Sequence, residues 1–292
     1  MFIKYFFPLK LMDRIVFLGT SGDSRVTAKQ QRASGGFVLQ IGEFQFHVDP
    51  GPGALVRAKE FAINSRATSG VIVTNNHLNH AHDVNAIVDA MTLGGIDKKG
   101  VLIGCESALH GDELRPPALS GFHRNCLERI IVLKAGQKAA IEDVEIHGIA
   151  SSHEDATAVG VRILAPKFTI GYSGDTAYSK DLVEGLDGCD IVILNVTHPE
   201  ATKVNYHLNR TDAIKILEKI HPKLAIITHF GFAMLKADPL LEARQMQIST
   251  GVQVVAAHDG LTLSPQSYAA QSNQARLTTF ETDKPVDEKS AV

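Results

Sequence analysis

The sequence predicts a single α/β domain in which the strands lie centrally and helices cover the outside. Short β-branched runs bounded by Gly, Pro and Asp alternate with segments of helical apolar spacing. No internal repeat and no linker divides the middle of the chain. Polar residues of metal-ligand type follow several of the predicted strands, which is typical of layered α/β folds whose loops gather at one edge of a sheet.

In the N-terminal half, a strand at 15–19 ends in a tight Gly-containing loop, and strands at 36–41 and 44–48 predict a hairpin. The loop 49–53, which reads DPGPG, stops the second of these strands. The elements expected after it are a helix at 54–63, a strand at 71–73, a helix at 82–91 and strands at 101–103, 130–133, 139–141 and 144–146.

The C-terminal half predicts a second hairpin and then alternating strands and helices. The expected strands are 158–164, 168–172, 191–194, 224–228 and 252–256, and the expected helices are 211–220 and 239–249. We expect residues 1–11 to be an N-terminal extension, 12–264 to be the domain, and 265–292 to be a mobile tail. The tail is too polar to bury the apolar area that would offset its ordering entropy.

Composition excludes several classes of protein. Of 292 residues, 44% are hydrophobic and 21% are charged, and the formal charge of −3 argues against a strongly basic nucleic-acid binder. Three cysteines are too few for a disulfide scaffold, whereas 13 histidines are present. No stretch reaches the roughly 18 consecutive apolar residues of a membrane span. We expect a cytoplasmic protein in which imidazole and carboxylate groups hold any metal.

Residues of metal-ligand type follow four of the predicted strands. A single loop histidine is most often a solvated polar residue, but four sets in order indicate a metal site. Neutral imidazole and carboxylate are ligands that zinc and other divalent first-row metals prefer. The residues concerned are His77, His80, His153, Asp175 and His229.

These residues and two loops give the chain a resemblance to the metallo-β-lactamase-fold metallo-hydrolase superfamily, and to its ribonuclease Z-like branch in particular. The segments 17–22 (FLGTSG) and 49–53 (DPGPG) are similar to early motifs of that branch. The resemblance spans residues 14–263. It implies a four-layer αβ/βα sandwich, in which two mixed β-sheets pack face to face and helices flank both outer surfaces.

The superfamily motif His-x-His-x-Asp-His corresponds to the segment 75–80, which reads NNHLNH. The resemblance implies one or two divalent ions, zinc first and manganese or iron as alternatives, at one edge of the fold. The residues that it assigns are, for site one, His77, His153 and Asp175 and, for site two, His80, Asp175 and His229.

Two asparagines depart from this motif. Asn75 stands where the superfamily has its first His, and Asn79 stands where it has the Asp. An Asn carbonyl is neutral and suits hard cations, so both residues are weak ligands at best, and zinc affinity should fall, most at site one. Two imidazoles and a carboxylate still form a recognised catalytic set. Two functions stay open: a hydrolase with reduced activity, or a non-catalytic relative that serves in binding or assembly.

The resemblance also implies two catalytic residues. A divalent ion lowers the pKa of a bound water from about 15.7 toward about 7, and Asp175 would orient the resulting metal-bound hydroxide. His207 lies in a segment where ribonuclease Z-like proteins carry a His that assists proton transfer to the leaving group, a task that suits imidazole. The alternative, weighted about equally, is an exposed histidine before a helix.

The expected substrate is a small phosphodiester or related ester. Ribonuclease Z enzymes usually carry a tRNA-binding arm between the later metal His and the bridging Asp. Here two predicted strands and a turn fill the interval between His153 and Asp175. With no arm and no basic run, tight binding of tRNA is not expected. We expect a small-molecule partner and no membrane partner, and leave a homo-oligomer open.

Overall fold

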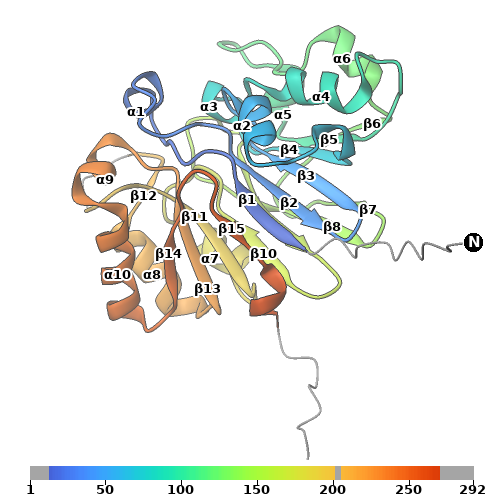
Figure 1. The fold of residues 1–292 in the computed structure, drawn as a ribbon. Coiled ribbons are helices and arrows are strands. Elements are labelled where there is room, and N and C mark those ends of the chain that lie inside the picture. Colours follow the sequence, from blue (N-terminus) through green and yellow to red (C-terminus); the bar gives the residue numbers. More distant parts are fainter. Residues whose placement is uncertain (1–12, 201–204, 270–292) are drawn as a thin grey trace, which may run out of the picture.

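The computed structural model describes residues 13–200 and 205–269, which form two β-sheets packed face to face with helices on both outer surfaces (Figure 1). Among the described residues, the first sheet has seven strands in the order β15-β1-β2-β3-β4-β5-β6. The second has eight, in the order β14-β13-β11-β10-β9-β8-β7 with β12 beside β11. The predicted four-layer fold is confirmed. No helix in the described part of the chain is both long and apolar enough to cross a membrane.

The first sheet is built mainly from the N-terminal half of the chain. The predicted hairpin of β2 and β3 is present, with Phe37 opposite Val48, and β3 to β6 continue the sheet in parallel. Its strands are β1 (Arg14–Phe17), β2 (Phe37–Ile41), β3 (Phe44–Val48), β4 (Gly70–Val73), β5 (Val101–Gly104), β6 (Arg129–Val132) and β15 (Thr262–Leu263). The helices of this half are α1 (Ser24–Ala28), α2 (Ala54–Glu60), α3 (Leu78–Ala81), α4 (Val84–Thr92), α5 (Glu106–His110) and α6 (Gly121–Cys126), with a 3-10 turn η1 (Ser65–Ala67).

The second sheet is built from the C-terminal half. Its strands are β7 (Lys138–Ile141), β8 (Val144–Ala150), β9 (Val159–Leu164), β10 (Thr169–Tyr172), β11 (Ile191–His198), β12 (Leu208–Asn209), β13 (Leu224–Thr228) and β14 (Val254–Ala256). The helices are α7 (Lys180–Leu186), α8 (Arg210–Ile220), α9 (Phe232–Ala237) and α10 (Pro239–Thr250), and a 3-10 turn η2 (Pro265–Tyr268) follows β15. Strands β10, β11, β13 and β14 are parallel, so their carboxyl ends meet at one edge.

Two apolar clusters hold these layers together. Ile191 and Ile193 of β11 belong to the cluster between the sheets, whereas Val192 and Leu194 belong to the cluster under the helices of the second sheet. Successive side chains of a strand point to opposite faces, and both faces of β11 are covered. The continuous apolar run at 191–194 is therefore explained by burial on two sides.

The structure adds helices that the sequence pattern did not predict. Helices α1, α5, α6, α7 and α9 have five to seven residues each, too few for an apolar period to be recognised. The helix expected at 82–91 is α4, and a separate short helix, α3, precedes it. The proposed extension 1–11 lies outside the described residues, as does 270–292 of the proposed tail, so the domain boundaries stay a prediction.

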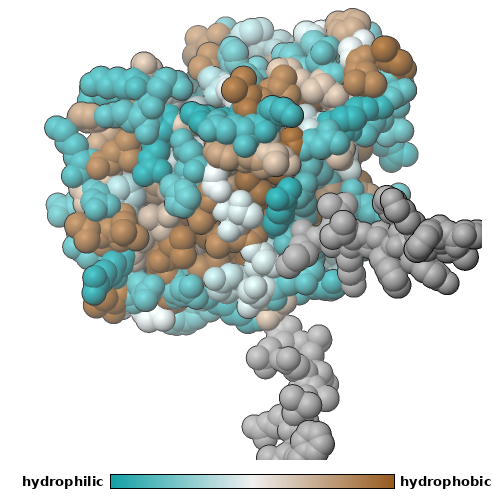
Figure 2. Space-filling model, viewed as in Figure 1, coloured by the Kyte–Doolittle hydropathy of each residue, from teal (hydrophilic) through white to brown (hydrophobic). Residues whose placement is uncertain are grey.

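Helix α10 carries apolar residues on more than one face. Ala243 and Met246 are buried against the second sheet, whereas Leu240, Leu241 and Ile248 are exposed. Figure 2 shows the corresponding brown surface over α10 among mostly hydrophilic residues. Because its apolar residues do not form one stripe, the spacing alone did not show which face of this helix packs.

Candidate metal centre

The five ligand-type residues predicted from the sequence lie together at one edge of the sandwich. They form two groups that share Asp175, and within each group the ligand atoms lie within 4.8 Å of one another. The groups are His77, His153 and Asp175, and His80, Asp175 and His229. Segments that are distant in sequence meet here because strands of both sheets end at this edge (Figure 1).

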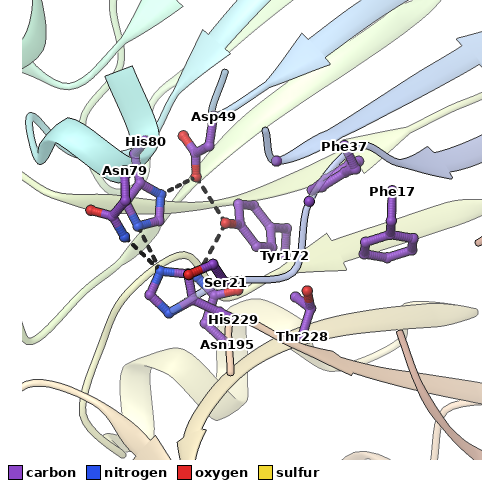
Figure 3. A pocket seen from close by; sticks show the side chains of 12 residues that line it. Phe17, Ser21, Phe37, Asp49, Asn79, His80, Tyr172, Asn195, Thr228 and His229 are labelled. Atoms are coloured by element: carbon purple, nitrogen blue, oxygen red, sulfur yellow. Dashed lines mark hydrogen bonds and ion pairs between the residues drawn. The ribbon is translucent and has the colours of Figure 1, made fainter. Parts of the chain in front are cut away.

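His80, a member of the second group, lies between Asp49 and His229 (Figure 3). Its Nε2 is 3.0 Å from Oδ2 of Asp175 and 3.0 Å from Nε2 of His229, and its Nδ1 is 2.9 Å from Oδ2 of Asp49. The ring is 2% exposed, because His80 lies on the buried side of α3. One nitrogen of His80 is thus held by an outer carboxylate while the other faces the shared Asp175.

Asp49 is a buried carboxylate beside the centre that the sequence did not single out. Its carboxylate accepts hydrogen bonds from the backbone N–H of Thr74 (2.7 Å), the hydroxyl of Thr74 (2.6 Å) and the hydroxyl of Tyr172 (2.8 Å), in addition to His80. An outer carboxylate of this kind sets the orientation and tautomer of a metal-binding histidine. Asp49 directly follows β3, and the other ligand-type residues also follow strands. This position in the sequence could therefore have indicated a role for Asp49 at the centre.

Two further contacts position Asp175 and His153. The amide of Asn195 donates to Oδ1 of Asp175 at 2.7 Å, which leaves Oδ2 directed at His80. The hydroxyl of Ser151 donates to the carbonyl of Asp175, so the segment after β8 is tied to the segment after β10. This tie explains why His153 lies next to Asp175. Asn195, in the middle of β11, had no recognisable signal in the sequence.

The FLGTSG segment positions His229. Phe230 donates its backbone N–H to the carbonyl of Thr20 at 2.7 Å, and Gly22 donates to the carbonyl of Phe230 at 2.9 Å. A Cβ on Gly22 would lie 1.9 Å from the carbonyl oxygen of His229, so only glycine fits there. His229 itself has φ +63°, a strained conformation for histidine that the surrounding contacts maintain.

The two asparagines lie in different surroundings. Asn79 lines the cavity beside His80, and its Nδ2 is 2.9 Å from Nε2 of His229. Asn75 is fully buried, and its carbonyl oxygen accepts the backbone N–H of His77 at 2.9 Å. The amide of Asn79 therefore faces the centre, whereas the oxygen of Asn75 is already used in a local turn.

His207 lies on the side of the centre formed by the second sheet. Its ring is 5.8 Å from the ring of His153 and 6.2 Å from that of His229, measured between centroids. Its Nδ1 is buried and has no hydrogen-bond partner among the described residues. The structure thus places this predicted catalytic histidine beside residues of both groups. His82, in contrast, is exposed and bonds only to the neighbouring Asp83 among the described residues.

Electrostatics at the centre favour a cation. Burial alone would lower the pKa of His80, but Asp175 and Asp49 raise it to about 10. Burial would raise the pKa of Asp175, yet the neighbouring imidazoles hold it well below its usual value. Burial lowers the pKa of His153 to about 4 and that of His229 to about 3, so both are neutral at pH 7. The buried carboxylate of Asp175 and these two neutral imidazoles form a donor set that suits a divalent ion.

A small cavity beside His80 and His229 and two buried nitrogen atoms support the same interpretation. A cavity of about 20 Å³, lined by Asp49, Asn79, His80 and His229 among others, has room for about one water or ion. Nε2 of His153 and Nδ1 of His229 are buried without a hydrogen-bond partner in the described part of the chain, although Nδ1 of His229 lies 3.4 Å from Oδ1 of Asp175. Buried polar atoms are normally paired, so these nitrogens fit a metal that completes them.

A groove of about 1120 Å³ opens beside the centre. It is bounded by α1, by the segment 76–85 that includes α3, and by the segment 115–118. His77 and Asn79 belong to its lining, so the groove is continuous with the metal-ligand groups. It is large enough for a substrate of small-molecule size.

Comparison with known proteins assigns the family. The family model for the β-lactamase superfamily domain matches residues 45–230, which is more than half of the chain. The chain belongs to the β-lactamase superfamily. This superfamily protein is 34% identical over 249 residues to the uncharacterized protein MJ1374 of Methanocaldococcus jannaschii, covering 85% of this chain and 93% of the relative.

Solved structures show the same fold. The metallo-β-lactamase fold protein YhfI of Bacillus subtilis superposes with a TM-score of 0.71 at 16% identity, covering 86% of this superfamily protein and 99% of YhfI. A diphosphatase of the PhnP family superposes with a TM-score of 0.64 at 17% identity, with coverage of 86% and 97%. The metallo-β-lactamase fold implied by the sequence resemblance is thus confirmed.

Proposed function

We propose that this protein is a metal-dependent hydrolase of a small ester, with a phosphodiester as the first choice. The observation that carries the proposal is the pair of three-residue groups that share Asp175, in each of which the ligand atoms lie within 4.8 Å of one another. Both groups combine two imidazoles with one carboxylate, which is a catalytic type of metal-ligand set.

The residues that would hold the metal are those of the two groups. His80, Asp175 and His229 would form the better site, because Asp49 holds His80 from outside and all three side chains are buried. His77, His153 and Asp175 would form the weaker site, since the oxygen of Asn75 is engaged elsewhere. Zinc suits these ligands best, and manganese or iron are alternatives. When bound, such an ion supplies hydroxide near neutral pH and stabilises negative charge on the attacked group.

The chain's own residues have distinct tasks in this reaction. Asp175 would orient the nucleophile, because both groups share its carboxylate and Asn195 holds its Oδ1. His207 would give a proton to the departing alkoxide, because it lies beside both groups with one ring nitrogen unpaired among the described residues. Asp49 would keep the Nε2 of His80 directed at the centre.

The groove supports a small substrate. Its lining combines apolar Pro52, Leu78 and Pro116 with uncharged polar side chains, and Arg115 is its one residue of full positive charge. A polynucleotide would need several cations along its backbone, whereas one ester group at the centre needs none beyond the metal. Likeness in fold to a PhnP-family diphosphatase supports phosphoric esters over other esters.

Metal analysis and an activity panel test the proposal. We expect the protein to retain zinc, manganese or iron after reconstitution and dialysis, and to hydrolyse bis-p-nitrophenyl phosphate faster than lactones. The His80→Ala variant should lose both properties, while His147→Ala, which alters a histidine on β8 paired with Glu145, should keep them. A wild type that retains no metal, or retains it without hydrolysing any ester, would instead support the binding or assembly role.

A further inference from the structure

His77, Glu154 and Arg115 form a hydrogen-bonded cluster on the groove side of the centre. Nε2 of His77 is 2.7 Å from Oε1 of Glu154, and Nη2 of Arg115 is 3.0 Å from the same oxygen. Nη2 of Arg115 is also 3.1 Å from Nε2 of His77. The two polar partners of the ring are thus a carboxylate that accepts and a guanidinium that only donates.

These contacts determine which nitrogen of His77 carries the proton. A neutral imidazole carries one N–H, on either Nδ1 or Nε2, and its hydrogen-bond partners decide which. A nitrogen lone pair directed at a carboxylate 2.7 Å away would be repelled, whereas an N–H can be donated to it. The contact with Glu154 is shorter than the 3.1 Å contact with the guanidinium of Arg115, so it favours a proton on Nε2. Nδ1 is then the unprotonated nitrogen of His77, a residue that belongs to one group with His153 and Asp175.

The guanidinium is itself firmly held. Asp112 accepts Nη1 of Arg115 at 3.1 Å through Oδ2, and accepts the backbone N–H of Arg115 at 2.7 Å through Oδ1. Arg115 therefore forms ion pairs with both Asp112 and Glu154, and it holds the carboxylate of Glu154 beside the ring of His77. This arrangement fixes the direction from which the acceptor approaches His77.

The backbone around His77 is tied to the same segment. The side-chain amide of Asn76 donates to the carbonyl of Pro116 at 3.1 Å and to that of Ser107 at 3.0 Å. The backbone N–H of Asn76 donates to Asp155, the residue after Glu154. The segments that hold the ring of His77 also hold its backbone, so the ring has little freedom to turn.

We propose that Arg115 and Glu154 are positioning residues that keep the proton of His77 on Nε2 and its Nδ1 available to a metal. The proposal rests on the proposed metal centre and deepens it. Site one has no histidine at position 75, where the superfamily motif has its first His. The tautomer of each remaining ligand of this site therefore matters more. Glu154 does for His77 what Asp49 does for His80, but from a partly exposed position at the groove.

The sharpest test removes the acceptor while the donor stays. In Glu154→Ala, Arg115 remains beside Nε2 and can donate only to a lone pair, so the proton should move to Nδ1. We expect nitrogen NMR shifts of His77 in the metal-free variant to report this change, and zinc affinity at site one to fall by about 10- to 100-fold. Glu154→Gln keeps an acceptor without its charge and should give a smaller loss. The double variant Glu154→Ala with Arg115→Met should recover part of the affinity, because the competing donor is gone.

The chain supplies a closely matched control. Nε2 of His147 is 2.7 Å from Oε2 of Glu145, the same distance as between His77 and Glu154. The side chains are also alike in exposure, 21% and 53% against 20% and 50%. Glu145→Ala should change the tautomer of His147 without changing zinc affinity. Both variants should unfold at nearly the wild-type temperature, because half-exposed pairs contribute little to stability.

Two results would overturn the proposal. One is a wild-type His77 with its proton on Nδ1, and the other is a Glu154→Ala variant that keeps both the wild-type tautomer and the wild-type zinc affinity. If the wild type bound no metal, the proposed function would fail, whereas the tautomer measurement in metal-free protein would still decide the role of Glu154 and Arg115.

Discussion

Replacing Asn79 by Asp should strengthen metal binding at the centre. The amide nitrogen of Asn79 is 2.9 Å from Nε2 of His229, so a carboxylate there would lie among the proposed ligands without any rearrangement of the loop. Asn79 and Asp have nearly the same shape, and Asn79 already lines the cavity. The change therefore adds a negative charge and a strong ligand at constant geometry.

The magnitude follows from charge and burial. Two unit charges about 4 Å apart interact by about 4 kcal/mol at an effective dielectric constant of about 20. Repulsion from Asp175 and the partial desolvation of a new carboxylate at this half-buried position offset part of this gain. We expect zinc to bind about 10- to 100-fold more tightly, which is about 1.4 to 2.7 kcal/mol. Without metal, the same repulsion and the lost hydrogen bond to His229 should destabilise the fold by about 1 to 3 kcal/mol.

Zinc titration against a competing chelator measures the first effect, and urea unfolding with and without zinc measures the second. Asn125→Asp is the control, because Asn125 is exposed on α6 and the variant carries the same added charge away from the centre. The reasoning is refuted if Asn79→Asp folds normally yet binds zinc no more tightly than Asn125→Asp does. Tighter binding with lower ester hydrolysis would show that the amide of Asn79 has a task on the substrate.

Three further predictions concern other groups. His207→Ala should lower kcat by about 100-fold or more for alkyl phosphodiesters but much less for p-nitrophenyl esters, whose leaving group needs no proton; equal losses for both would contradict a general acid. Asp49→Asn should weaken zinc binding by about 10- to 100-fold, because His80 loses the carboxylate that orients it. It should also lower the free energy of unfolding, measured in urea, by about 3 kcal/mol, because the four groups that donate hydrogen bonds to Asp49 lose a buried, negatively charged acceptor. Burial lowers the pKa of His47 to about 3, so between about pH 6.5 and 3 the unfolded chain binds a proton that the folded chain does not. Stability should then fall by up to about 1.4 kcal/mol per pH unit as the pH decreases through this window. His47→Leu should flatten this slope, and an unchanged slope would refute the assignment.

The sequence predicted the parts of the centre that lie close along the chain or repeat a recognisable pattern. His77 and His80 belong to one motif, and Asp175 and His229 each follow an apolar strand, so residue type and strand context together indicated a metal site. The hairpin of β2 and β3 was predicted because the alternation of its side chains and its Gly-containing turn are local features of the sequence. The short helices were missed because five to seven residues do not complete two turns.

Contacts between distant segments were decided only by the tertiary structure. Asp49 supports His80, and Glu154 supports His77, across separations of 31 and 77 positions along the chain. No local pattern encodes such pairings, because each depends on how two sheets and their loops pack. The sequence by itself determined which side chains are chemically able to bind a metal and that strands bring them to one edge. The tertiary structure decided which nitrogen of each histidine faces inward, that the amide of Asn79 faces the centre, and that the oxygen of Asn75 is held in a turn. The physical reason is that ligand type resides in single residues, whereas orientation and protonation are set by partners that only folding brings within hydrogen-bond distance.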